Sequence, residues 1–399
     1  MIALFTTPPG FGIVRLPIVL VEWSVTLLTG CVAMGALFAL YRDQLRTDGR
    51  MDLFDALNEG RSEKTLANAN RDLGIRLRRA CRRILGGRWL LVGDIVEIRS
   101  LDEIRMTLDQ SGCLDGLPFM PEMAKFCGRR ALVFRCADKI YDYGRSKTLR
   151  RVKDAVLLVG LRCDGSAHGG CQASCYLLWK TPWLRPVGNG PPAREAVRDP
   201  ARAEWPESIP STGRYICQYT QLVAASISMR KWDIRQDLRP ALAGNVTLGA
   251  FAVAILTRLF NVVQAARRGA GYPGWGVATG QSVRSTARDL APGDTVRVLA
   301  MEDIAPTLNE KGRNRGLWFD RDMIRHCGRR YTVLRRVERI IDDATGQMQE
   351  LKTPCVVLDG AEASGEFLRF CAQAEYPFWR EVWLSRELDG GRVRTGGSG

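Results

Sequence analysis

The chain has 399 residues, of which 46% are hydrophobic and 25% are charged. These values are ordinary for a folded protein of two or three domains, which needs no disulfide framework to hold a core together. The formal net charge is +15, and only nine of the 58 basic residues are lysine. This excess of arginine favours anionic partners, namely nucleic acid, anionic lipid head groups or acidic polymers, although an arginine-rich coding bias on solvated faces explains it equally well.

The N-terminal segment, 1–51, contains a long apolar stretch at 17–41, in which Glu22 is the only charged residue. Such a stretch is long enough to span a bilayer core of roughly 30 Å. The stretch is therefore predicted to be a transmembrane helix. Three arginines follow within ten residues, and this positive charge predicts that the bulk of the chain lies in the cytoplasm. The alternatives are a buried helix or a start codon placed too early, either of which leaves a soluble cytoplasmic protein.

The next segment, 52–90, alternates leucine and isoleucine with many arginines and is predicted to form a basic helix. A basic helix beside a membrane is attracted to anionic lipid head groups. A plain solvated helix fits the same pattern. Further along, the apolar stretch 241–263 is interrupted by Arg258, which favours a helix packed on a surface over a second membrane span.

Residues 93–184 and 293–384 are two copies of one sequence, aligned at a constant offset of 200 with 28 of 92 positions identical and no gap. The four residues Cys-Gly-Arg-Arg at 127–130, for example, recur at 327–330. Self-similarity at a fixed spacing indicates a repeated structural unit. The repeat therefore predicts one β module at 91–185 and a second at 291–386.

Each copy reads as several short strands joined by glycine-rich turns, and Asp342–Gly346 reads as a hairpin turn. We expect an α+β, mainly β protein: two homologous small SH3-like β modules, with helical N-terminal and linker segments. Between the modules, 186–213 is a proline-rich linker and 214–290 is a helical linker segment. The glycine-rich tail, 387–399, is predicted to be disordered.

The repeated stretches GLPFMPEM, CGRR, LRCDGSAHGGC and WKTPWL, with GLWFDRDM and YPFWREVWL in the second copy, resemble an uncharacterised family of bacterial proteins that carry both copies. The similarity covers roughly residues 76–386, including the joining segment from Cys217 to Asn245. It implies no activity and no catalytic residues. Members of that family tend to carry a further cysteine where this chain has Ala363.

The first copy concentrates metal-ligand residue types in the glycine-rich segment CDGSAHGGCQASC. The candidate ligands are Cys127, Cys163, His168, Cys171 and Cys175. Thiolates with an imidazole favour a zinc site, and four thiolates would also suit an Fe–S cluster, which is the weaker reading. The alternative is a set of small apolar side chains packed in a core.

The second copy keeps Cys327 and Cys371, and adds Cys355 and His326. A site with three cysteines and a histidine is the weaker of the two metal hypotheses. Otherwise this copy is held together by packing alone.

Tryptophans and arginines recur at matched positions and are candidates for partner binding. At helical spacing the paired tryptophans would share a face, and packing or an aromatic and basic platform are the two interpretations. These candidates are Trp179, Trp183, Trp379, Trp383, Arg129, Arg130, Arg329 and Arg330.

The sequence contains no P-loop, no dinucleotide fingerprint, no zinc-protease helix and no nucleophile elbow. We therefore expect a non-enzymatic, membrane-tethered scaffold or accessory subunit that binds a protein partner or a membrane complex. The alternatives are a zinc- or Fe–S-dependent redox or enzyme component, and a nucleic-acid-binding protein.

Overall fold

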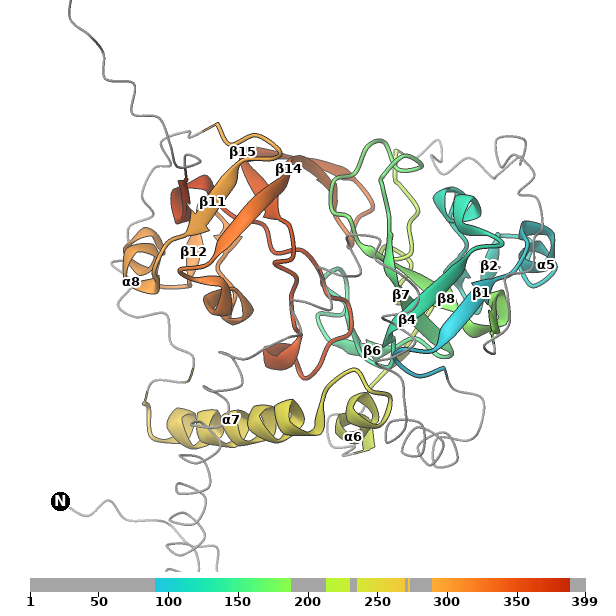
Figure 1. The fold of residues 1–399 in the computed structure, drawn as a ribbon, viewed down its shortest axis with the longest axis horizontal. Helices are drawn as coiled ribbons and strands as arrows, with labels where there is room; N and C mark the ends of the chain where they lie inside the picture. Colours follow the sequence, from blue (N-terminus) through green and yellow to red (C-terminus); the bar gives the residue numbers. More distant parts are fainter. Residues whose placement is uncertain (1–89, 188–212, 230–234, 270–271, 273–288, 388–399) are drawn as a thin grey trace, which may run out of the picture.

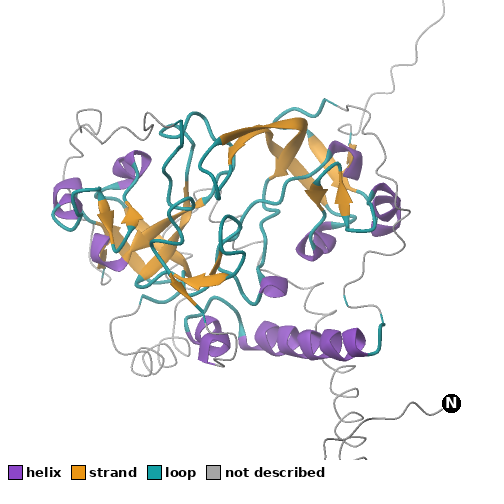
Figure 2. Ribbon diagram, turned by 180° about the vertical axis from the view of Figure 1, so that it is seen from behind, coloured by secondary structure: helices purple, strands orange, loops and turns teal. Residues whose placement is uncertain are grey.

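The computed structural model describes residues 90–187, 213–229, 235–269, 272 and 289–387. Over these residues the protein is mainly β, with two curled half-barrel sheets and few helices (Figures 1 and 2). One sheet comes from each copy of the repeat. The two sheets lie on opposite sides of the molecule with their loops between them, and α6 (Arg235–Leu242) and α7 (Leu248–Ala266) run along one edge (Figure 1).

Both sheets are antiparallel and share one strand order. The first is ordered β8-β7-β4-β1-β9, and the second β15-β14-β11-β16. Their strands are β1 (Ile95–Ile98), β4 (Arg130–Cys136), β7 (Ala155–Arg162), β8 (Tyr176–Lys180), β9 (Leu184–Pro186), β11 (Thr295–Val298), β14 (Arg330–Ile341), β15 (Met348–Leu358) and β16 (Leu384–Arg386). In the second sheet an isolated bridge between Val356 and Trp379 takes the place of β8.

Short helices and strands complete the fold, and several of them recur at the same offset of 200. They are α5 (Leu101–Arg105), α8 (Met301–Ile304), and the 3-10 helices η2 (Pro121–Phe126), η3 (Thr181–Trp183), η5 (Ala305–Thr307), η6 (Arg321–His326), η7 (Glu366–Leu368) and η8 (Glu381–Trp383). The small strands are β2 (Cys113–Leu114), β3 (Leu117–Pro118), β5 (Ile140–Tyr141), β6 (Leu149–Arg151), β10 (Ile227–Ser228), β12 (Arg313–Asn314) and β13 (Leu317–Trp318).

The repeated Cys-Gly-Arg-Arg stretch is a turn that leads from a 3-10 helix into the central strand of each sheet. Gly128 and Gly328 have φ values of 74° and 77°, a left-handed conformation that glycine adopts without steric cost. Gly128 N donates to Ile98 O at 2.8 Å, and Gly328 N donates to Val298 O at 2.9 Å. The predicted hairpin turn after Ile341 is also confirmed, since β14 and β15 pair on both sides of it.

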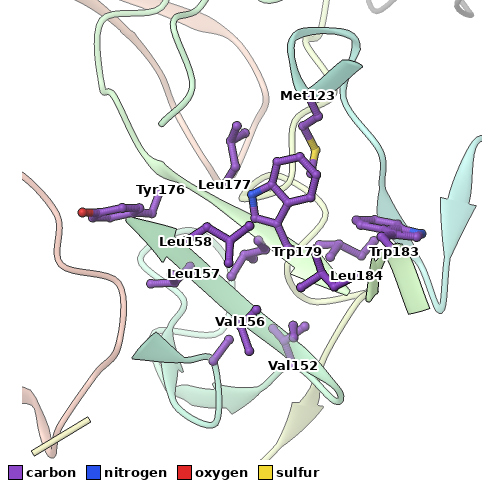
Figure 3. Packing of buried hydrophobic residues seen from close by; sticks show 14 of the residues in the cluster. Met123, Val152, Val156, Leu157, Leu158, Tyr176, Leu177, Trp179, Trp183 and Leu184 are labelled. Carbon is purple, nitrogen blue, oxygen red and sulfur yellow. The ribbon is translucent and has the colours of Figure 1, made fainter. Parts of the chain in front are cut away.

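The four repeated tryptophans lie in the cores of the modules. Trp179, Trp183, Trp379 and Trp383 are each 0% exposed. They are not on helices: Trp179 lies in β8 and Trp183 in η3, so the helical spacing expected for this pair is wrong. Figure 3 shows both side chains among the aliphatic residues of the first module.

Matched aromatic contacts indicate that the two cores are built alike. Phe119 packs edge-on against Trp183 with ring centroids 5.2 Å apart, and Phe319 packs against Trp383 at 5.1 Å. Edge-to-face packing at this range adds to the gain from burial alone. The tryptophans therefore stabilise the cores and are not available to a partner.

The modules meet at Arg162 and Glu362, which occupy equivalent positions in the repeat. The Arg162 guanidinium lies 2.5 Å from Glu362 Oε1. It is also sandwiched between the rings of Tyr176 and Tyr376, at 3.7 and 4.0 Å from their centroids. Because these tyrosines are equivalent too, the contact lies at the centre of the paired modules.

None of the described helices is long and apolar enough to cross a membrane. This finding corrects the expectation of a membrane-anchored protein, and it includes the stretch at 241–263, most of which forms α7. The predicted span 17–41 lies outside the described residues, as do nearly all of the basic segment 52–90, the proline-rich linker 186–213 and the tail 387–399.

Candidate metal centre

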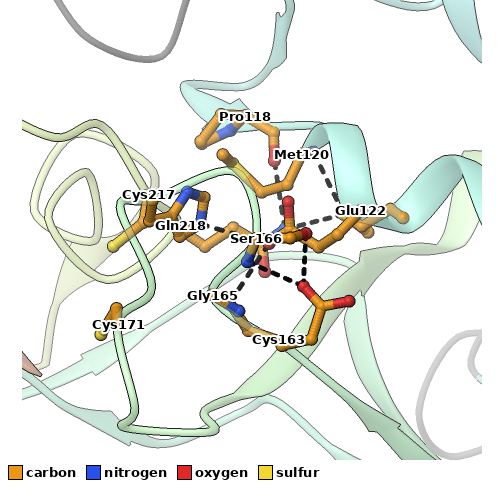
Figure 4. Close-up of polar contacts among 12 residues, drawn as sticks. Pro118, Met120, Glu122, Cys163, Gly165, Ser166, Cys171, Cys217 and Gln218 are labelled. Carbon is orange, nitrogen blue, oxygen red and sulfur yellow. Dashed lines mark hydrogen bonds and ion pairs between the residues drawn. The ribbon is translucent and has the colours of Figure 1, made fainter. Parts of the chain in front are cut away.

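A buried group of three unlike donors forms where η2 meets the loop between β7 and β8. Glu122 comes from η2, and Cys163 and His168 come from the loop 163–175, which we call the docking loop. Figure 4 shows Glu122 reaching from its helix toward the part of the docking loop that carries Cys163 and Gly165.

Glycine allows the docking loop to fold back on itself. Gly165 has a φ of 76°, and a Cβ added there would lie 2.1 Å from the carbonyl oxygen of Cys171. His168 N donates to Gly165 O at 3.0 Å, and Cys163 N donates to Cys175 O at 2.8 Å. The turn thus brings the Cys163 and His168 side chains to the same carboxylate.

The Cys163 and His168 side chains converge on one oxygen of Glu122. The Cys163 thiol donates to Glu122 Oε1 at 3.2 Å, and His168 Nε2 lies 3.2 Å from the same atom. All three ligand atoms lie within 4.8 Å of one another. Glu122 is 5% exposed and His168 is 2% exposed, so bulk water does not compete for these contacts.

Burial and the Glu122 carboxylate set the protonation of the group. Burial raises the pKa of the Cys163 thiol well above its usual range, and the neighbouring Glu122 charge raises it further. Burial alone would lower the pKa of His168, but the hydrogen bond and charge of Glu122 outweigh it and leave that pKa above its ordinary value. The Cys163 thiol therefore keeps its proton, and the His168 imidazole is shifted toward its charged form.

The donor set fits a metal ion. Carboxylate oxygen, thiolate sulfur and imidazole nitrogen are the three common zinc ligands, and bonds of about 2.0–2.3 Å place two of them roughly 3–4 Å apart. Glu122 Oε2 is also buried and accepts no hydrogen bond from any residue that the structure describes. Such an orphaned oxygen is costly unless an ion or a water satisfies it. The group could hold a metal, and it differs from the all-thiolate sets that hold Fe–S clusters.

A small cavity of about 30 Å³ adjoins the group. It is lined by the three donors, by segments of both modules and by the joining segment, including Cys171, Cys175, Cys217, Gln218, Ile341 and Asp343. Burial raises the pKa of Cys217 to about 12 and that of Cys175 well above its usual range. These thiols lie near the group without belonging to it.

Of the five ligands proposed for the first copy, the structure brings together Cys163 and His168. Cys127 ends η2 as a buried cap, with a pKa raised by burial to about 11, and does not line the cavity. Glu122 was missed. Its one signal in the sequence is that an acid recurs at the equivalent position, Asp322.

The docking loop has a counterpart in the second module that lacks the donors. Ala363 and Leu368 stand where the first copy has Cys163 and His168. Asp322 instead accepts hydrogen bonds from Ser364 Oγ at 2.7 Å and from Gly365 N at 3.1 Å. The same loop thus closes on the same helix through a hydroxyl and backbone amides.

The ligands proposed for the second copy have separate partners. His326 Nδ1 lies 2.6 Å from Tyr331 Oη, and burial lowers the pKa of His326 to about 4. Arg380 donates to Cys355 Sγ at 3.2 Å, whereas Cys371 donates to Gln373 Oε1 at 3.1 Å. Cys327 caps η6, and among the described residues these four form no group within ligand distance.

The repeated arginines lie at the module surfaces, unlike the tryptophans. Arg129 and Arg329 are exposed, and their carbonyls accept from Ile98 N and Val298 N, both at 2.9 Å. Arg330 pairs with Glu387 at 2.6 Å. Arg130, half-buried, begins β4.

No protein-family model matches this chain, and neither a curated protein nor a solved structure is significantly similar to it.

Proposed function

We propose that the protein is a non-enzymatic scaffold in which a zinc ion, held by Glu122, Cys163 and His168, fixes the docking loop that joins two SH3-like modules of common ancestry. The observation that carries this proposal is that one loop supplies two of the three donors and also contacts the second module. The net charge of +15 supports an acidic surface of another protein as the partner.

The docking loop binds β14 through one backbone hydrogen bond and through two of its side chains. Gln172 N donates to Arg339 O at 3.0 Å, and Gln172 Oε1 accepts from Glu338 N at 2.6 Å and from Arg339 N at 3.1 Å. One residue away, Cys171 Sγ accepts from Ile341 N at 3.4 Å. An ion that orders the loop at Cys163 and His168 would therefore order the surface that binds the second module.

The size of the adjoining cavity supports a structural ion over a catalytic one. A cavity of about 30 Å³ is large enough for a water molecule but not for an organic substrate. A catalytic zinc site also needs an accessible open position, and both Glu122 and His168 are buried. The metal would act as a staple for the fold.

The test uses the second copy as its template. The full chain is purified without added metal, and its zinc content is measured beside the double variant Cys163→Ala, His168→Leu, which installs the residues found at Ala363 and Leu368. We expect about one zinc per wild-type chain, as one three-ligand group implies, and none in the variant. Chelation should lower the Tm of the wild type alone, because only that chain loses a ligand bound to its folded state.

Cys113→Ser is the matched control, since Cys113 is a half-buried thiol outside the group. It should keep the zinc and the chelator response. A wild-type chain that is metal-free, and whose Tm does not respond to added zinc, would contradict the proposal. A coloured, iron-containing protein would point to an Fe–S cluster instead.

A further inference from the structure

A groove of about 710 Å³ separates α7 from the second module. One wall is a face of α7, and the other is built from η6 and from residues 366–370. The two walls touch at one end, where Phe251 of α7 stacks on Phe370 with ring centroids 5.3 Å apart. This volume lies within the roughly 300–1,000 Å³ of ordinary small-molecule sites.

The groove combines positive charge with apolar surface. A single acidic residue, Glu366, lies among five arginines: Arg258, Arg321, Arg325, Arg329 and Arg369. Between them lie Val262, which is 62% exposed, and Phe367, which is 37% exposed. A guanidinium carries five N–H donors, so an arginine that already pairs within the protein keeps donors for a ligand.

Backbone strain in the second copy coincides with this groove. Arg369 and Phe370 have φ values of 50° and 64°, in the left-handed region that side chains disfavour. The equivalent residues of the first copy are Gly169 and Gly170, with φ values of 61° and 78°. The second copy thus keeps the strained turn but places a guanidinium and a ring where glycine would fit better. Strain of this kind concentrates at functional sites.

We propose that this groove binds a small organic anion with an apolar body, such as a fatty carboxylate or an alkyl phosphate. The arginines would bind the head group through bidentate hydrogen bonds, and Val262 and Phe367 would cover the apolar part.

The experiment measures binding of a dansyl-labelled fatty acid to the full chain, followed by displacement with dodecanoate, dodecyl phosphate or dodecyl trimethylammonium. We expect the two anions to displace the probe and the cation to fail. The stronger of the two anions then identifies the head group.

Arg369→Gly separates loss of binding from loss of folding, because it removes a guanidinium from the groove and also relieves the strained turn. We expect it to fold at least as well as wild type and to bind the probe about tenfold more weakly. Arg258→Ala, which removes an exposed arginine from the α7 wall of the groove, should weaken binding similarly and covers the case in which the first variant misfolds. Arg185→Ala, a surface arginine of the first module, should bind as wild type does. Absence of probe binding, or binding unchanged by both groove variants, would overturn the proposal.

Discussion

Glu122 Oε1 lies 3.2 Å from both the Cys163 thiol and the His168 imidazole, so the proton occupancies of these three side chains are linked. In the absence of a metal, the thiol keeps its proton because its pKa is raised. The imidazole is held partly in its charged form by the carboxylate, which raises the pKa of His168. A metal ion must displace both protons to bind.

This competition predicts the pH dependence of zinc affinity. Raising the pH lowers the concentration of competing protons, so zinc should bind more tightly as the pH rises from about 6 to about 8. The association constant should rise about tenfold to a hundredfold per pH unit, since one or two protons leave per ion. Competition with a chromophoric chelator at several pH values measures this slope. An affinity independent of pH would show that Cys163 and His168 do not bind the ion.

The same three residues show which ligands the sequence can identify and which it cannot. Cys163 and His168 stood out because their residue types are rare and clustered. Glu122 did not, because an acidic residue in a short helix is ordinary unless its environment is known, and its burial follows only from the tertiary packing of η2 on the docking loop. The spacing of the tryptophans is also ambiguous. A separation of four residues fits one face of a helix, but it also fits a strand followed by a 3-10 turn, as in Trp179 and Trp183.

At the scale of elements, the repeat predicted more than the residue patterns did. Because the offset of 200 runs without a gap, a strand in one copy predicts a counterpart in the other, and β1, β4, β7 and β9 correspond to β11, β14, β15 and β16. The sequence could not show that β14 extends far enough to meet the docking loop, since that contact joins Gln172 to Arg339, far away in the chain. Nor could it show that β8 has no full counterpart, where only the bridge from Val356 to Trp379 remains.

Two glycines, Gly160 in β7 and Gly165 in the docking loop, distinguish the cost of a steric clash from the cost of a left-handed backbone conformation. Gly160 and Gly165 have φ values of 71° and 76°, but a Cβ at Gly160 meets nothing within 4 Å, whereas at Gly165 it would clash with the Cys171 carbonyl at 2.1 Å. Gly160→Ala should therefore cost only about 1–2 kcal/mol of unfolding free energy. Gly165→Ala should cost more, because the docking loop must also move.

Urea unfolding of both variants measures the difference, and zinc content provides a second readout. We expect Gly165→Ala to lose zinc and Gly160→Ala to retain it. Equal losses of stability together with equal zinc contents would show that the turn does not position the donors.

At the scale of the whole molecule, the two modules are joined by a buried ion pair as well as by the docking loop. Arg162 and Glu362 have side chains that are 11% and 14% exposed. Arg162 also donates to the carbonyl oxygens of Ser174 and Ala374, another equivalent pair, at 2.8 and 2.9 Å. One guanidinium thus satisfies acceptors from both modules.

Arg162→Ala should weaken the pairing of the modules, since it leaves a buried carboxylate without its partner. We expect a loss of about 3–5 kcal/mol in unfolding free energy, and faster proteolysis between the modules. The exchanged variant, Arg162→Glu with Glu362→Arg, should recover part of the loss because the flanking tyrosines are equivalent. Arg185→Ala, which removes the ion pairs of an exposed arginine with Glu97 and Glu103, should cost less than about 1 kcal/mol. A similarly small cost for Arg162→Ala would show that the ion pair does not hold the two modules together.

The opposite charges at positions 162 and 362 also decide which surfaces can recognise each other. If a first module met another first module in this arrangement, two guanidinium groups would face each other at the centre, and two second modules would bring together a pair of carboxylates. Like charges in so dry a place repel strongly. The interface of each module is therefore complementary to the other module and not to a second copy of itself. A symmetric dimer of either module could not reproduce this contact.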